Sequence, residues 1–305
     1  MIRKGIAALI CLLASAALPS SVSWSKEPVD VWVSILPQKY FVEKIAGGLA
    51  RVSVMVQPGA NPVTYEPRPA QLKRMARSDI YFAIGVPFER AWLKKIAALN
   101  PLMQVIRTDK DIKKREMLSG HHHGERNPLK KRHSKGDNGP GEPFKDPHVW
   151  LSPPLVKIQA NVIADALIRI DPSNKSIYEN NLKGFQAELD RLDSELRELF
   201  AGTGQKTEFL VFHPSWGYFA DAYGLRQIAV ETEGKEPSAS DTARLIGYCK
   251  DKGIKLVFAQ PQFSAKSAKI IAREIGGKVV FIDPLNERWM ENLRAVAREL
   301  KASLR

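Results

Sequence analysis

Two histidines and one aspartate occupy positions in this sequence where metal ligands are often found. His213 ends the apolar run Phe209–Pro214, and Asp283 ends a similar run, Lys278–Pro284, so each is followed directly by a proline. Short apolar runs bounded by such breakers predict strands buried on both faces, as in parallel sheets. Ligands of open α/β sheets bind beyond the carboxyl ends of the strands. With His148 as a third candidate, the pattern predicts a metal site. The alternative is ordinary hydrogen-bonded histidines of the core or loops.

The elements that must position these side chains alternate between strands and helices. This alternation predicts an α/β protein of two lobes, each with a parallel sheet flanked by helices. The expected strands are Val29–Leu36, Arg51–Val56, Asp79–Ile84, Gln104–Arg107, Glu208–Phe212, Leu225–Val230, Ile254–Ala259 and Val279–Ile282. The expected helices of the lobes are Tyr40–Ala46, Pro69–Arg77, Phe88–Leu99, Trp216–Tyr223, Ser240–Asp251 with Ser238 or Ser240 as its N-cap, Ala265–Ile275 and Trp289–Ser303.

Between the lobes the sequence predicts two amphipathic helices. They cover Leu155–Ile170 and Ile177–Phe200, and the second, roughly 35 Å long at 1.5 Å per residue, is expected to run as one rigid rod between the lobes. A coiled coil is the alternative, but the apolar repeat is short. The chain therefore divides into a signal peptide (1–25), an N-terminal lobe (26–154), linking helices (155–203) and a C-terminal lobe (204–305).

The N-terminus indicates export. Arg3 and Lys4 precede the apolar run Gly5–Leu18, and small residues that suit cleavage follow at positions 21–25. This is the pattern of a secretory signal peptide and is too short for a membrane span. Cys11 leaves with the signal, so Cys249 has no partner for an intramolecular disulfide, and a zinc site must form without a cysteine cluster. We predict an exported, soluble, periplasmic protein.

The net charge of +13 falls to about +11 once Arg3 and Lys4 are removed. A basic balance of this size suits nucleic acid or an anionic membrane surface. Export and the lack of basic motifs interleaved with aromatic residues argue against nucleic acid. Much of the excess positive charge lies in one polar segment, which favours the interpretation that these charges are simply solvated.

That segment, residues 119–145, contains His121, His122 and His123, a basic KKRH run and almost no apolar residues. It cannot bury enough surface to order itself, so we expect a mobile loop. Short histidine-rich tracts bind transition metals weakly through neutral imidazole. The alternative is a merely solvated insertion.

Several motifs together resemble one family. They are GANPVTYEP (59–67), SDIYFAIGVPFERAWL (78–93), DPHVWLSP (146–153), FHPSWGYFADAYGL (212–225), EPSASDTARLI (236–246), FAQPQFSAKSAKIIA (258–272) and IDPL (282–285). In this order, over essentially the whole mature chain, they are similar to the zinc/manganese solute-binding receptors of bacterial ABC importers. The His-rich loop resembles the zinc-type receptors.

The resemblance implies a monomeric receptor that carries a divalent ion in the cleft between its lobes to an ABC permease. The usual ligands are three histidines and one carboxylate, and His148, His213 and Asp283 match three of these positions. Val63 stands where the first family histidine is expected and supplies no donor. Water, a histidine of the 121–123 tract or Glu66 is then available as the fourth ligand of a zinc ion. The remaining alternative is a receptor that has lost tight binding.

Two imidazoles and one carboxylate suit Zn²⁺ better than an oxygen-rich Mn²⁺ site. The leading hypothesis is therefore zinc capture and delivery without catalysis. A receptor for Mn²⁺ or another divalent ion is the first alternative. A zinc hydrolase is a second, because two histidines and a carboxylate with an open water position also build catalytic zinc sites. The chain has no HExxH pair, which argues against it.

Overall fold

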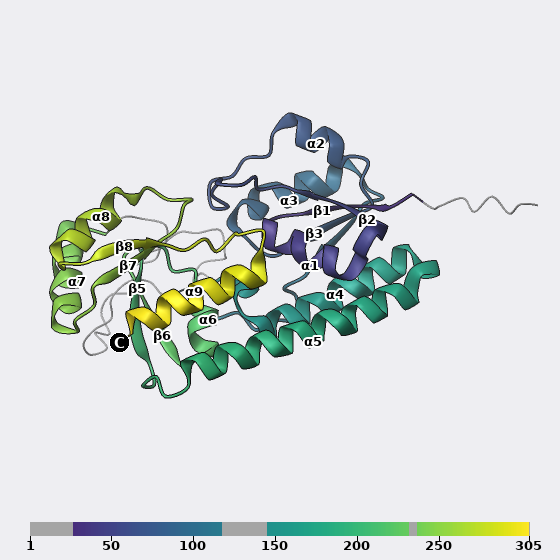
Figure 1. Cartoon of the computed structure of the whole chain (residues 1–305). Coiled ribbons are helices and arrows are strands. Elements are labelled where there is room, and N and C mark those ends of the chain that lie inside the picture. The colour runs from purple at the N-terminus through teal and green to yellow at the C-terminus, as the bar shows by residue number, and fades with distance from the viewer. Residues whose placement is uncertain (1–26, 118–144, 232–236, 305) are drawn as a thin grey trace, which may run out of the picture.

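The structure, a computed structural model, describes residues 27–117, 145–231 and 237–304. Each of the two lobes contains a four-stranded parallel sheet, which confirms the predicted α/β architecture (Figure 1). The predicted signal peptide and the His121–His123 tract lie outside the described residues. Within the described ranges no helix is both long and apolar enough to cross a membrane.

The N-terminal sheet has the strand order β2-β1-β3-β4. Its strands are β1 (Val29–Val33), β2 (Ala50–Val54), β3 (Ile80–Ala83) and β4 (Gln104–Arg107). Its helices are α1 (Leu36–Ala46), α2 (Pro69–Met75) and α3 (Pro87–Leu99). Helices α2 and α3 pack together, whereas α1 lies on the other side of the sheet, against the helices that link the lobes (Figure 1).

The C-terminal sheet has the corresponding order β6-β5-β7-β8. Its strands are β5 (Thr207–Val211), β6 (Leu225–Ala229), β7 (Leu256–Ala259) and β8 (Lys278–Phe281). Its helices are α6 (Gly217–Ala222), α7 (Ala239–Asp251), α8 (Ala265–Glu274) and α9 (Trp289–Ser303). The N-cap of α7 is Ser238, whose hydroxyl accepts the backbone N–H of Asp241, as one of the two predicted caps.

Two antiparallel helices join the lobes, α4 (Pro153–Ile170) and α5 (Lys175–Phe200). Helix α5 packs on α1 of the first lobe and on α9 near the end of the chain. At this junction the Trp289 ring meets Phe41 edge-on at 5.0 Å between centroids, and Phe41 packs on Phe185 of α5 at 6.1 Å. One continuous core therefore extends across both lobes.

Two details of the sequence-based prediction were wrong. Helix α1 begins at Leu36, before Pro37, because a proline in the first helical turn gives up no intrahelical hydrogen bond. The run Lys278–Pro284 is not buried on both faces. Strand β8 is an edge strand, and Phe281 is 55% exposed. Strand β5, in the interior of the sheet, has the predicted burial in its last three residues.

Candidate metal centre

His213 lies directly beyond the carboxyl end of β5 and is held on three sides. Its backbone N–H donates to Gln260 Oε1 at 3.1 Å, and its carbonyl accepts from Gln260 Nε2 at 2.9 Å. Phe263 stacks on the imidazole with 4.5 Å between centroids. The ring Nδ1 lies 3.0 Å from Glu231 Oε2, and both side chains are buried. With Nδ1 engaged by this carboxylate, Nε2 is the ring nitrogen left to bind a metal.

His148 comes from the segment between the lobes, just before a single 3₁₀ turn at Val149–Leu151. Its Nδ1 lies 2.8 Å from Asp146 Oδ1, and the same oxygen accepts the His148 backbone N–H at 3.0 Å. Burial lowers the pKa of His148 below its usual value, and the Asp146 carboxylate partly opposes that effect. The imidazole is therefore neutral at pH 7, and its Nε2 is available as a donor.

The two imidazoles meet between the lobes. Their ring centroids are 5.3 Å apart, with the planes inclined at 72°. Each ring has its Nδ1 fixed by a buried carboxylate, an arrangement that orients a metal-binding histidine and raises the basicity of its free nitrogen. A pair of oriented Nε2 atoms in a buried position is suited to a divalent transition metal.

Asp283 lies two strands away from His213 in the same sheet, beyond the end of β8. Its Oδ1 accepts from Gln262 Nε2 at 2.7 Å and from the Leu285 backbone N–H at 2.9 Å. The Asp283 carboxylate lines a cavity of about 360 Å³ together with the β1–α1 turn and the 56–59 turn of the first lobe. Among the described residues, no three His, Cys, Asp or Glu side chains converge as a metal-binding group. The structure thus pairs His148 with His213 and leaves Asp283 outside that pair.

The segments that carry His148 and Asp283 are nevertheless fastened together. Trp150 Nε1 donates to the carbonyl of Pro284 at 2.7 Å, and Trp289 Nε1 donates to the carbonyl of Trp150 at 2.8 Å. Trp150 lies two residues after His148, and Pro284 follows Asp283 directly. Trp289 is the first residue of α9. These hydrogen bonds connect the segment that carries His148 to the segment that follows Asp283.

The remaining candidates are less well placed. Val63 is 40% exposed, and Glu66 is also exposed, on the turn between β2 and α2. The three histidines at 121–123 lie in a part of the chain that the structure does not describe. The source of a fourth ligand therefore stays a prediction.

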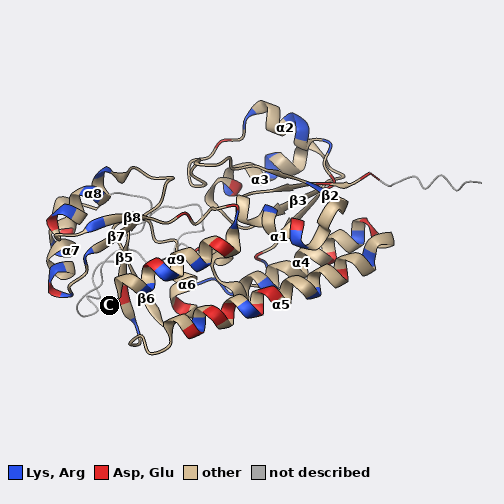
Figure 2. Ribbon diagram, in the orientation of Figure 1, with Lys and Arg blue, Asp and Glu red and all other residues tan. Residues whose placement is uncertain are grey.

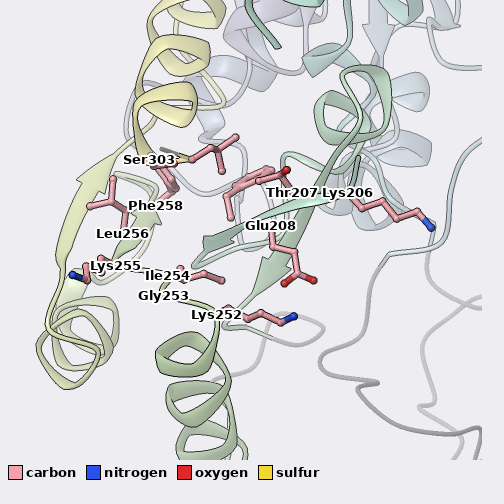
Figure 3. Close-up of a pocket in the computed structure, with 12 residues that line it drawn as sticks. Lys206, Thr207, Glu208, Lys252, Gly253, Ile254, Lys255, Leu256, Phe258 and Ser303 are labelled. Atoms are coloured by element: carbon pink, nitrogen blue, oxygen red, sulfur yellow. The ribbon is translucent and has the colours of Figure 1, made fainter. Parts of the chain in front are cut away.

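A second hollow of about 410 Å³ lies at the opposite end of the C-terminal sheet, where β5 and β7 begin (Figure 3). Its one lining carboxylate, Glu208, already accepts from Tyr248 at 2.6 Å and pairs with Arg226 at 3.2 Å. The hollow contains no histidine and is not a candidate metal site.

Sequence reasoning missed two residues that hold His213, Glu231 and Gln260. Both missed residues lie just beyond strand ends, Glu231 after β6 and Gln260 after β7. Gln260, which is followed by Pro261, fits the rule that selected His213 and Asp283, whereas Glu231 is followed by Thr232 and does not. What the rule could not supply was the strand order, which puts β6 and β7 on either side of β5.

Comparison with known proteins bears directly on this geometry. A family model described as ZnuA, the periplasmic component A of a zinc-uptake complex, matches residues 31–303. The chain belongs to this family. Its members are uptake components of the periplasm, which confirms the prediction of a transport receptor rather than an enzyme.

Solved structures and curated relatives agree with the family. A crystal structure of ZnuA superimposes with a TM-score of 0.82 at 43% identity, covering 92% of this chain and 100% of that one. A zinc-bound deletion variant of ZnuA gives 0.80 at 43% identity, covering 91% and 98%. The high-affinity zinc uptake protein ZnuA of Bacillus subtilis is 27% identical over 91% of this chain and 85% of its own. A putative metal-binding protein of Chlamydia muridarum is 29% identical over 88% and 89%.

Proposed function

We propose that this receptor carries Zn²⁺ and binds it between the lobes through Nε2 of His148, Nε2 of His213 and one oxygen of Asp283. The observation that carries the proposal is the pair of buried imidazoles 5.3 Å apart, each with Nδ1 engaged by a carboxylate. The donor set, rich in nitrogen, favours Zn²⁺ over Mn²⁺. The zinc-bound ZnuA structure supports the same choice.

Asp283 is within reach of this pair. Strands β5 and β8 are separated by β7, so the chain beyond β8 lies about 10 Å from the chain beyond β5, two strand spacings. A histidine and an aspartate extending toward each other span that gap with an ion between them. Because Asp283 Oδ1 already accepts two hydrogen bonds, Oδ2 is the oxygen left for the metal. Binding then requires a small approach of the 283–288 segment to the imidazoles.

The fourth position goes to water, to a histidine of 121–123 or to Glu66, since Val63 offers no donor. We further propose that residues 1–25 direct export, that residues 26–154 and 204–305 form the lobes around linking helices 155–203, and that the loaded receptor delivers its ion to an ABC permease.

The test is a competitive zinc titration of chelator-stripped protein, with His213→Ala and a variant lacking residues 119–140 beside the wild type. We expect tight one-to-one binding that collapses in His213→Ala and survives the deletion. Collapse in both variants would assign the fourth ligand to the loop. Weak binding in the wild type that His213→Ala leaves unchanged would reject the zinc site. The same titration with Mn²⁺, expected to be much weaker, tests the choice of ion.

A further inference from the structure

The surface formed by α2, α3 and the turns at their ends carries a concentration of positive charge, which we call the cationic face. Figure 2 shows Lys and Arg on both helices. Between residues 66 and 95 there are seven Lys and Arg against three acidic residues, Glu66, Asp79 and Glu89, and Glu89 is buried. All seven cations are exposed: Arg68, Lys73, Arg74, Arg77, Arg90, Lys94 and Lys95.

The cations on this face differ from the charged residues of α5 in how they are paired. On α5, five of the six carboxylates form ion pairs with a Lys or Arg: Glu179, Glu188, Asp190, Asp193 and Glu195. On the cationic face, leaving Arg90 aside, no Lys or Arg lies within ion-pair distance of a carboxylate of the described chain. Two of them instead lie over indole rings, Arg74 over Trp32 at 5.4 Å and Lys95 over Trp92 at 4.5 Å. The face keeps a net positive potential that an anionic partner would neutralise.

Exposed leucines adjoin these cations. Leu102 is 91% exposed and Leu99 is 43% exposed, in and just before the turn that follows α3. The turn is attached to the segment between α2 and β3 by a hydrogen bond from Asn100 Nδ2 to the carbonyl of Ser78 at 3.0 Å. This bond holds Asn100, which lies between the two leucines in the sequence, beside Ser78, the residue that follows Arg77. A basic surface edged by exposed apolar side chains is suited to the boundary between headgroups and acyl chains of an anionic bilayer.

The location of the cationic face leaves the metal centre free. Helices α2 and α3 lie on the side of the N-terminal sheet away from α4 and α5 (Figure 1). None of their residues lines the cavity next to Asp283, and His148 and His213 are buried between the lobes. Contact on this face and metal binding can thus occur together.

We propose that the cationic face binds the surface of anionic phospholipid bilayers, with its lysines and arginines on the headgroups and Leu102 and Leu99 at the apolar boundary. Such binding is peripheral and reversible, and it is independent of the bound ion. It would concentrate the receptor on the membrane that holds its permease.

The test is co-sedimentation of chain 26–305 with vesicles of phosphatidylcholine containing 30% phosphatidylglycerol, beside pure phosphatidylcholine, at low salt. We expect binding to the anionic vesicles only. Replacing Lys73, Arg77, Lys94 and Lys95 with Gln should weaken it about tenfold or more, because each such cation contributes measurably near a charged bilayer. Leu102→Ser should weaken it about threefold without changing the protein's charge.

The matched control replaces four exposed lysines of the C-terminal lobe with Gln: Lys250, Lys252, Lys255 and Lys278. It removes the same charge, so it should keep near wild-type binding, and thermal unfolding should show both quadruple variants folded. Equal weakening by the two quadruple variants would overturn the proposal by assigning binding to net charge alone. Failure of the wild type to sediment with anionic vesicles would also overturn it, and would leave the face to an acidic protein. A zinc titration on the same samples reports the metal site separately.

Discussion

The carboxylate of Glu231 provides a direct test of how the candidate centre works. It accepts the Nδ1 proton of His213 at 3.0 Å, and both side chains are buried. Partners of this kind typically contribute 10- to 100-fold to metal affinity, or about 1.4–2.7 kcal/mol at 1.36 kcal/mol per factor of ten. Glu231→Gln keeps an acceptor oxygen but loses the charge, so we expect about tenfold weaker zinc binding. Glu231→Leu removes the acceptor and should approach a hundredfold.

Glu231→Leu should also lower the free energy of unfolding by about 1–3 kcal/mol, because it leaves the His213 N–H buried without a partner. The assay is competition with a chromogenic chelator at pH 7.5, together with urea unfolding of the metal-free protein. Glu198→Gln on the exposed side of α5 removes the same charge and should leave both measurements unchanged. If Glu231→Leu bound zinc like the wild type while His213→Ala did not bind, the orienting role would be refuted.

Three further predictions concern stability. Because burial lowers the pKa of His148, the unfolded chain takes up a proton at this residue at a higher pH than the folded chain does. The metal-free protein should therefore lose stability as the pH falls below about 6.5. Calorimetry from pH 7.5 to 5.5 should show a smaller loss of stability in His148→Gln. Trp289→Ala should lower the free energy of unfolding in urea by about 3–5 kcal/mol, because it leaves a cavity beside Phe41 and Phe185. A decrease below 1 kcal/mol would contradict a core shared by the two lobes. A Cβ on Gly277 would overlap the backbone carbonyl oxygen of Lys255, so Gly277→Ala should destabilise by about 1–3 kcal/mol, whereas Gly247→Ala, in open space on α7, should be neutral or stabilising in the same assay.

Local sequence signals predicted the elements well because they depend on neighbours along the chain. β4 and α9 have the expected bounds, and the other elements differ at their ends. The burial of β8 was mispredicted because an apolar run does not say whether its strand is central or at an edge. His148 and His213 were found from spacing and resemblance. Their partners depend on tertiary contacts: Gln260 is 47 residues from His213 and meets it only because β7 pairs with β5.

The packed rings of Trp289, Phe41 and Phe185 limit how far the two lobes can move apart when the receptor binds or releases its ion. A buried tryptophan removes about 150–250 Å² of surface from solvent. A state with the lobes apart and only Trp289 exposed to water would therefore be about 4–6 kcal/mol less stable. Fewer than about one molecule in a thousand would occupy that state at equilibrium. If the ion binds at the proposed site, its exchange then proceeds through small local rearrangements near Asp283 and Gln262. Empty and loaded molecules would have nearly the same outline, and a permease would have to distinguish them by the shape and charge of a few loops.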